Sequence, residues 1–254
     1  MSCRQTTGRE NDAIIYDRQD KPFRPLPQHD RQLAAMRPLP FGLAPETLSL
    51  QPAGARESKM PDTEPKIRKS LISGRELFVC DNLIDQMMVQ QVGNLARTLP
   101  YFRKEKSRPG VPGLAAVSEI PAERIAVDPF LGSLRQAVER LLPDERFSDQ
   151  RAYVNCSVYG DSYYLHRDSE PGEQHVTALY YANLEWQPDW GGETIYYNDE
   201  EDAELAITPR PGRLVIARGA ILHRGNVPSR SCYEQRYTLA YKLNSVGGTS
   251  LSAR

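Results

Sequence analysis

The sequence predicts a mainly β fold with supporting helices, in the form of a double-stranded β-helix, or jelly roll. From residue 152 onwards, short runs rich in Val, Tyr, Ile and Thr alternate with Gly, Pro and Asp, which is typical of successive strands. Before residue 152, two segments repeat apolar residues at three- and four-residue spacing, as amphipathic helices do. Many strands after two helices indicate two packed sheets with helices on one side.

The first part of the chain has a different composition from the rest. Residues 1–70 are polar and proline-rich, and the tetrapeptide Arg-Pro-Leu-Pro occurs twice, at 24–27 and 37–40. We expect an arm that packs on the core or on a neighbouring subunit, or that is disordered. If it packs on a neighbouring subunit, the protein forms a homo-oligomer through this arm. Such proline spacing also suits peptide-binding domains that recognise extended polyproline. We expect residues 71–254 to form the folded domain.

Two helices and one strand are expected before the strand-rich part. Residues 76–80 predict a strand. A helix should follow, capped by Asp81 or Asn82 and ended by Pro100, with one apolar face formed by Ile84, Met87, Met88, Val92, Leu95 and Leu99. Residues 101–123, rich in Arg, Lys, Pro and Gly, predict a surface loop or a lid. A second helix should follow, with Asp128 as its N-cap and Pro129 as its first residue. Its inward face should contain Leu131, Leu134, Val138 and Leu141.

Eight strands are expected in the remaining chain, near 152–159, 163–168, 175–184, 193–198, 204–208, 213–217, 220–223 and 235–243. In a strand, residues two apart point to the same face, so His166 and Asp168 would present an imidazole and a carboxylate side by side. His223 would add a second imidazole. Two histidines and one carboxylate form the facial triad of non-haem Fe(II) oxygenases. We expect no metal role for His29 or His175.

The surrounding motifs strengthen this metal hypothesis through their order. Asn155-Cys156-Ser157-Val158-Tyr159-Gly160 precedes His166, and Gly191-Gly192-Glu193-Thr194, Pro211 to Ile216 and Arg236 to Lys242 follow Asp168. Together these segments resemble the Fe(II)/2-oxoglutarate-dependent dioxygenase superfamily, and within it the prolyl-4-hydroxylase-like branch. The resemblance covers roughly residues 150–243 and extends more loosely back to about Leu71.

The resemblance implies the site and its cofactors. His166, Asp168 and His223 would hold Fe(II), leaving positions for 2-oxoglutarate and O2. Arg236 would pair with the far carboxylate of 2-oxoglutarate, because an arginine fork can make two parallel charged hydrogen bonds. Arg230 competes for this role but lies in a turn-like segment. Further candidates for co-substrate or ligand contacts, or else ordinary strand residues, are Asn155, Tyr159, Tyr163 and Thr238.

The resulting hypothesis is an enzyme that hydroxylates an unactivated C–H bond of a small molecule, an amino acid or specialised metabolite, free or carrier-bound. The resemblance implies that succinate and CO2 are released. Asp168 favours hydroxylation over chlorination, since related halogenases have a small residue at that position. Desaturation, cyclisation and epoxidation stay open, as do a protein or peptide (prolyl-type) hydroxylase, a nucleic-acid demethylase and a non-catalytic jelly-roll binding module.

Composition limits the other classes of function. The formal net charge of -1 argues against a nucleic-acid partner, because such binding depends on clustered positive charge. The chain shows no signal-peptide run and no run long enough to span a membrane, so we expect a cytoplasmic protein without a membrane partner. Cys3, Cys80, Cys156 and Cys232 are far apart, and we expect reduced structural thiols.

Overall fold

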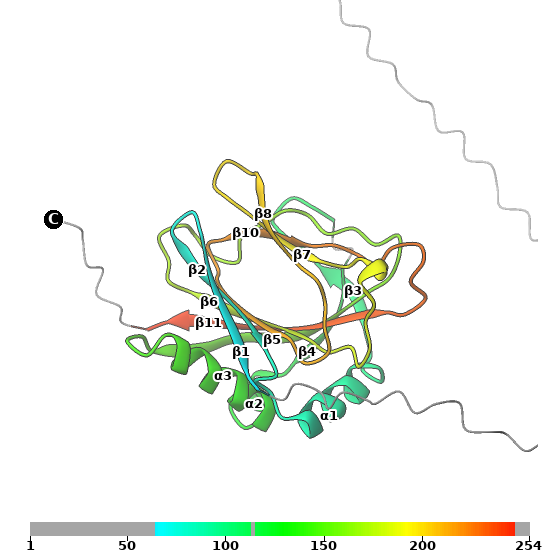
Figure 1. The fold of residues 1–254 in the computed structure, drawn as a ribbon, viewed down its shortest axis with the longest axis horizontal. Coiled ribbons are helices and arrows are strands. Elements are labelled where there is room, and N and C mark those ends of the chain that lie inside the picture. Colours follow the sequence, from blue (N-terminus) through cyan, green and yellow to red (C-terminus); the bar gives the residue numbers. More distant parts are fainter. Residues whose placement is uncertain (1–63, 113–114, 247–254) are drawn as a thin grey trace, which may run out of the picture. The chain divides into compact units, whose positions relative to one another are not determined.

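The computed structural model describes residues 64–112 and 115–246, and these form two antiparallel sheets with helices on one side (Figure 1). The mainly β, jelly-roll prediction is confirmed. Eight strands make the large sheet, in the order β1-β2-β9-β6-β11-β5-β4-β3, and three make the small sheet, in the order β10-β7-β8. Among the described residues, no helix has the length and apolar character needed to cross a membrane.

The strands have the following bounds. The large sheet contains β1 Lys66–Ile72, β2 Arg75–Asp81, β3 Phe102–Glu105, β4 Ala115–Ile120, β5 Phe147–Ser157, β6 Val176–Tyr181, β9 Leu214–Arg218 and β11 Arg236–Ser245. The small sheet contains β7 Thr194–Tyr197, β8 Ala203–Ile207 and β10 Leu222–Gly225. β1 begins within the segment that we expected to be the arm, because residues 66–72 pair with β2 across a tight turn at Ser73 and Gly74. The Arg-Pro-Leu-Pro repeats, His29 and Cys3 lie outside the described residues.

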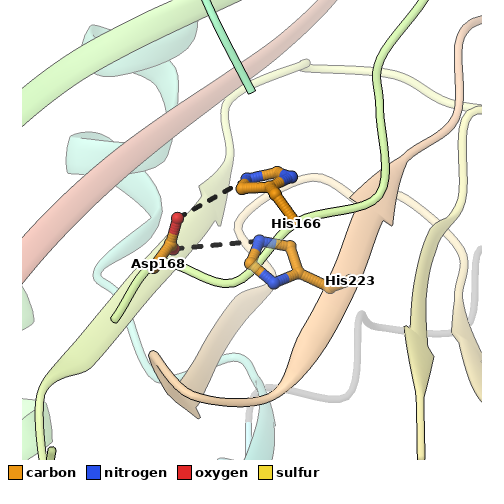
Figure 2. A group of neighbouring side chains, drawn as sticks. All are labelled: His166, Asp168 and His223. Atoms are coloured by element: carbon orange, nitrogen blue, oxygen red, sulfur yellow. Dashed lines mark ion pairs between the residues drawn. The ribbon is translucent and has the colours of Figure 1, made fainter. Parts of the chain in front are cut away.

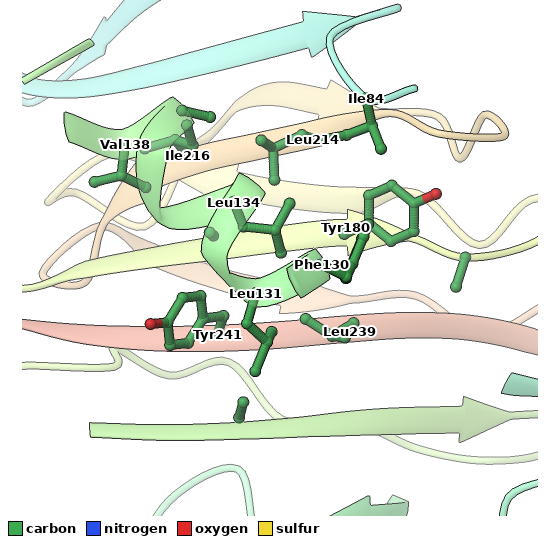
Figure 3. Packing of buried hydrophobic residues seen from close by; sticks show 14 of the residues in the cluster. Ile84, Phe130, Leu131, Leu134, Val138, Tyr180, Leu214, Ile216, Leu239 and Tyr241 are labelled. Carbon is green, nitrogen blue, oxygen red and sulfur yellow. The ribbon is translucent and has the colours of Figure 1, made fainter. Parts of the chain in front are cut away.

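The helix predicted after Asp128 is confirmed as α3, Pro129–Leu141. The Asp128 carboxylate accepts hydrogen bonds from the backbone N–H groups of Phe130 and Leu131, at 3.0 and 3.1 Å. The inward side chains of α3 pack against the large sheet, on strands β6, β9 and β11 (Figure 3). Leu131 and Leu134 are at most 1% exposed, and burying each such side chain contributes about 1.5–3 kcal/mol.

The helix predicted after residue 81 exists as α1, Gln86–Ala96, but its predicted cap was wrong and its predicted apolar face was right only in part. Asp85 is the cap, since its carboxylate accepts from the N–H groups of residues 87 and 88. Ile84, Met88, Val92 and Leu99 pack against the core as predicted, whereas Met87 and Leu95 are exposed. The buried face also contains Val89, Gly93 and Ala96, because Gly93 lets α1 approach Leu184 more closely than any side chain would allow.

Two further expectations were wrong. Residues 101–123 are not one loop: they contain β3 and β4, and the short helix α2, Ala122–Ile125, begins there. The proline and glycine residues that suggested a loop lie between the strands, while Val117 is fully buried opposite Asn155. Residues 163–168 are not a strand either; His166 forms only an isolated bridge with His223. The described cysteines, Cys80, Cys156 and Cys232, are buried and free, as expected.

Candidate metal centre

His166 and His223 are brought together by the backbone rather than by a shared strand. His166 lies in the segment between β5 and β6, and His223 lies on β10 of the small sheet. Each donates its backbone N–H to the carbonyl of the other, at 3.0 and 2.9 Å. Their ring centroids are 4.4 Å apart. This reciprocal pair fixes two imidazoles on one side of the same space (Figure 2).

Asp168 completes the group from the segment that follows His166. Its backbone N–H donates to the carbonyl of Gly219 at 2.8 Å, which holds the residue against the end of β9. Its Oδ1 lies 3.5 Å from His166 Nε2, and its Oδ2 lies 3.8 Å from His223 Nε2. One ligand atom from each of the three residues can be chosen so that all lie within 4.8 Å of one another. The predicted triad is therefore a converging donor set.

The hydrogen bonds of the two rings leave the Nε2 atoms facing the centre. His166 Nδ1 lies 2.9 Å from the carbonyl oxygen of Tyr164, and His223 Nδ1 lies 2.9 Å from that of Ile221. Since a carbonyl oxygen can only accept, each Nδ1 carries a proton, and each Nε2 is the ring nitrogen left to bind a metal. Burial, with His166 beside it, lowers the pKa of His223 to about 4, so this ring is a neutral donor at physiological pH.

The Asp168 carboxylate is nearly inaccessible and has two further partners. Oδ2 accepts a hydrogen bond from Thr177 Oγ1 at 2.6 Å, and Oδ1 accepts one from Lys242 Nζ at 2.8 Å. Burial alone would raise the pKa of this carboxyl, but His223, Lys242 and His166 hold it well below its usual range. Asp168 is therefore ionised at physiological pH, as a metal ligand must be.

The triad opens into a pocket between the two sheets with a cavity volume of about 140 Å³. One wall is a face of β11, where alternate residues line the pocket: Arg236, Thr238, Ala240 and Lys242. Asn155 and Tyr163 also line it, so four of the five predicted co-substrate residues come together with the triad. Tyr159 does not; it is 60% exposed and lies outside the residues that line the pocket.

Arg236 is buried and its guanidinium is held in one place. Nε donates to the carbonyl of Gly192 at 2.7 Å, and Nη2 donates to Thr194 Oγ1 at 3.0 Å. A Cβ atom on Gly225, two residues after His223 on β10, would lie 3.8 Å from Nη1. Arg236 therefore lies beside the strand that carries a triad histidine. Arg230, the competing candidate, is exposed and does not line the pocket.

Gly192 makes room for this arginine. Its φ of +77° is a conformation that favours glycine, and a Cβ there would lie 3.0 Å from both Arg236 Cδ and the Trp186 ring. The hydroxyl of Tyr163 is a further polar group of the pocket: it is buried, lies near Ser157, and forms no hydrogen bond of ordinary geometry with a described residue. Burial raises its pKa to about 12, so the phenol is neutral and can donate.

Sequence reasoning assigned no role to Lys242, Thr177 or Tyr196. Lys242 shares the parity of Arg236 and Thr238, so the alternation along β11 could have placed it in the pocket. Thr177 pairs with Lys242 across β6 and β11, a contact that no local pattern reveals. The buried Tyr196 ring stacks on the His223 imidazole with centroids 5.5 Å apart.

Comparison with known proteins agrees with this geometry. The family model of the 2OG-Fe(II) oxygenase superfamily matches residues 154–242, which include the triad and Arg236. The chain is similar in fold to a prolyl hydroxylase from Trichoplax adhaerens, solved with a peptide fragment of the hypoxia inducible factor oxygen degradation domain. The identity is 21%, the match covers 66% of this chain and 83% of that one, and the TM-score is 0.53.

A second similar structure is a prolyl-4-hydroxylase from Pseudomonas putida. Its identity to this chain is 20%, the match covers 66% of this chain and 92% of that one, and the TM-score is 0.50. At these identities the two structures support the fold. No curated protein matches the chain.

Proposed function

For a chain that carries a 2OG-Fe(II) oxygenase domain of the prolyl-4-hydroxylase-like branch, we propose hydroxylation of an unactivated C–H bond of a small molecule. The substrate class that we propose is an amino acid or specialised metabolite, free or carrier-bound. The observation that carries the proposal is that His166, Asp168 and His223 converge in the lining of one pocket that also contains the buried Arg236.

The donor set fits Fe(II). Two neutral imidazoles and one ionised carboxylate, converging from one side, are the ligands of the facial triad and leave the other side open. When bound, Fe(II) supplies the activation of O2 that is coupled to the decarboxylation of 2-oxoglutarate to succinate and CO2. His166 and His223 are oriented for this role by the carbonyls that fix their Nδ1–H groups, and Asp168 by Thr177 and Lys242.

Arg236 would bind the far carboxylate of 2-oxoglutarate. Because Gly192 and Thr194 hold its Nε and Nη2, Nη1 is the atom that makes none of the described hydrogen bonds and lines the pocket with a free donor. In a site shielded from water, a charge-assisted hydrogen bond is stronger than at the surface. The Tyr163 hydroxyl is a second donor, and Asn155 and Thr238 are polar groups on neighbouring, paired positions of β5 and β11.

The size of the pocket supports a compact substrate. Its volume of about 140 Å³ lies below the roughly 300–1,000 Å³ of pockets for drug-sized ligands. Residues 105–107 also line it, and Ser107 Oγ accepts the backbone N–H of Tyr164 at 3.2 Å, which ties this segment to the triad segment. A volume of this size suits a compact reacting group. Asp168 in the triad supports hydroxylation rather than chlorination.

A second candidate is a peptide or protein prolyl hydroxylase. The similar structures from Trichoplax adhaerens and Pseudomonas putida are described as prolyl hydroxylases, and the former was solved with a peptide. Under this alternative, a proline side chain of a peptide would enter the pocket from the segment 105–107. The catalytic residues would have the same roles, so the two candidates differ only in what reaches them.

The experiment that tests the proposal is a substrate screen with the purified protein, Fe(II), 2-oxoglutarate and O2. Succinate is measured together with the mass of each candidate, using panels of free amino acids, carrier-bound amino acids, small metabolites and proline-containing peptides. We expect one small molecule to stimulate succinate formation and to gain one oxygen atom, and His223→Ala to abolish both. Oxygen gained by peptides alone would refute the small-molecule proposal in favour of the second candidate.

A further inference from the structure

We propose that Lys242 is a resident cationic partner of the Asp168 carboxylate, and that it positions this ligand and weakens the hold of the site on a divalent metal. The inference rests on the metal role proposed for Asp168. Lys242 belongs to β11, six residues after Arg236, and its side chain points from the same face of the strand into the pocket.

Two paired residues of neighbouring strands hold the two oxygens of the carboxylate. Lys242 Nζ donates to Oδ1 at 2.8 Å, and Thr177 Oγ1 donates to Oδ2 at 2.6 Å. Lys242 and Thr177 are register partners in the ladder between β11 and β6. The carboxylate is therefore oriented by rigid sheet positions rather than by a loop.

The contact is shielded from solvent. The side chain of Asp168 is 6% exposed and that of Lys242 is 17% exposed, and the ammonium also lies 5.8 Å from the centre of the Tyr153 ring. In such surroundings an ion pair is less screened than at the surface, so the ammonium and the carboxylate are strongly coupled. Lys242 is thus an integral part of the electrostatics of the metal site.

A metal ion must share Asp168 with this ammonium. A carboxylate has about four lone-pair positions, two on each oxygen, and Lys242 and Thr177 each use one. A metal that binds both oxygens at once would approach the ammonium closely, so the contact favours binding through one oxygen and leaves coordination positions for 2-oxoglutarate and O2. Repulsion between the ammonium and a divalent ion opposes binding.

Removal of the ammonium has the opposite effects. Asp168 would then be a buried carboxylate without its ammonium partner, and a buried charge without its partner is destabilising. The metal would become its principal cationic partner. Metal affinity should therefore rise, and the stability of the fold should come to depend on the metal.

The test compares Lys242→Gln, which keeps a hydrogen-bond donor but loses the charge, with Lys242→Met and Lys242→Arg. Lys106→Met is the matched control, since Lys106 lines the same pocket and has no described contact with Asp168. Mn(II), an air-stable ion of the same charge as Fe(II), is titrated into each full-length protein, and thermal unfolding is followed with and without it.

We expect the Gln variant, and the Met variant if it folds, to bind Mn(II) at least about tenfold more tightly, a cautious value for loss of a unit charge a few ångströms away. Their melting temperatures without metal should fall and be largely restored by Mn(II). The Arg variant and Lys106→Met should resemble the wild type. Unchanged or weaker Mn(II) binding by the Gln variant, or a loss of stability that Mn(II) does not reverse, would overturn the inference.

Mn(II) binding by the wild-type protein and by His223→Ala shows whether a failure concerns this inference or the proposed function. Wild-type Mn(II) binding that is lost in His223→Ala supports the metal centre, whatever Lys242 does. Wild-type protein that binds no Mn(II), or binds it equally in His223→Ala, refutes the metal centre and the inference with it. Normal wild-type binding with an unchanged Gln variant refutes the role of Lys242 alone.

Discussion

Replacing Arg236 by lysine or alanine should reduce the affinity for 2-oxoglutarate, and it should also lower stability through the lost contacts with Gly192 and Thr194. Arg236 is 4% exposed, and its Nε and Nη2 already donate to Gly192 and Thr194. Both N–H groups of Nη1 and the second N–H of Nη2 are therefore left to donate to a carboxylate. Hydrogen bonds to charged groups contribute about 1.5–3 kcal/mol each. Loss of one or two of them, about 1.5–6 kcal/mol in total, corresponds to a rise in Kd of roughly tenfold to ten-thousandfold.

The lysine variant separates charge from geometry. An ammonium keeps the positive charge but cannot donate along two parallel directions, so we expect Arg236→Lys to fall between the wild type and Arg236→Ala. The assay is an anaerobic titration of the Fe(II)-loaded protein with 2-oxoglutarate, followed by the visible charge-transfer absorbance of the chelate. Thermal unfolding of each variant shows whether the fold is kept.

Arg230→Ala is the matched control, because Arg230 is exposed and lies in the same connection before β11. Its Kd for 2-oxoglutarate should equal that of the wild type. If the Arg236 variants fold and bind 2-oxoglutarate as the wild type does, Arg236 does not anchor the co-substrate. A weakened Arg230→Ala protein would indicate that the anchor lies in the turn instead.

Three further predictions concern the triad, the glycine beside the arginine and acid stability. His166→Ala should abolish the coupled production of succinate, and near-normal succinate formation would contradict its role as a ligand. Gly192→Ala should lower the free energy of unfolding by about 1–2 kcal/mol, because a φ of +77° disfavours a side chain, and the new Cβ would contact Arg236. Urea unfolding measures the loss of stability, and the 2-oxoglutarate titration measures the effect on Arg236. Wild-type values in both would refute this account. Burial alone would raise the pKa of the Asp81 carboxyl, but the Arg213 guanidinium, which donates to it at 2.7 and 2.9 Å, lowers this pKa. The ion pair therefore contributes to stability above about pH 4, and this contribution is lost as pH falls through the lowered pKa. Asp81→Asn should therefore flatten the decrease of melting temperature as pH falls below about 4, and an unchanged slope would contradict the linkage.

Features fixed by neighbouring residues could be predicted from the sequence. Asp128 followed by Pro129 defines the start of α3, because a capping carboxylate and a residue with a helical φ act within one turn. The triad residues could be named from their types and order. Their assembly was predicted for a partly wrong reason, since residues 163–168 are not a strand and His166 is placed by His223, 57 positions later, through mutual backbone hydrogen bonds.

Features that depend on distant partners could not be predicted in the same way. Part of the buried face of α1 is set by the close approach of Gly93 to Leu184, and a glycine does not stand out as an apolar residue in a helical sequence pattern. Lys242 reads as a polar residue near the end of a strand, and its position beside Asp168 arises only when β11 pairs with β6. Tyr159 follows β5 closely in sequence, yet it lies in the turn with Gly160, where Asp161 Oδ2 accepts the backbone N–H of Val158, and its side chain is exposed.

The regular alternation of pocket residues along β11 fixes the spacing between them. Arg236, proposed to hold one end of 2-oxoglutarate, and Lys242, which contacts the metal-ligating Asp168, are six residues apart on one continuous strand. At about 3.4 Å per residue, their backbone positions are separated by roughly 20 Å, and this spacing is set by peptide geometry. Loops at the entrance could therefore change in length or sequence, and admit different substrates, without altering the distance between the anchor and the reacting centre.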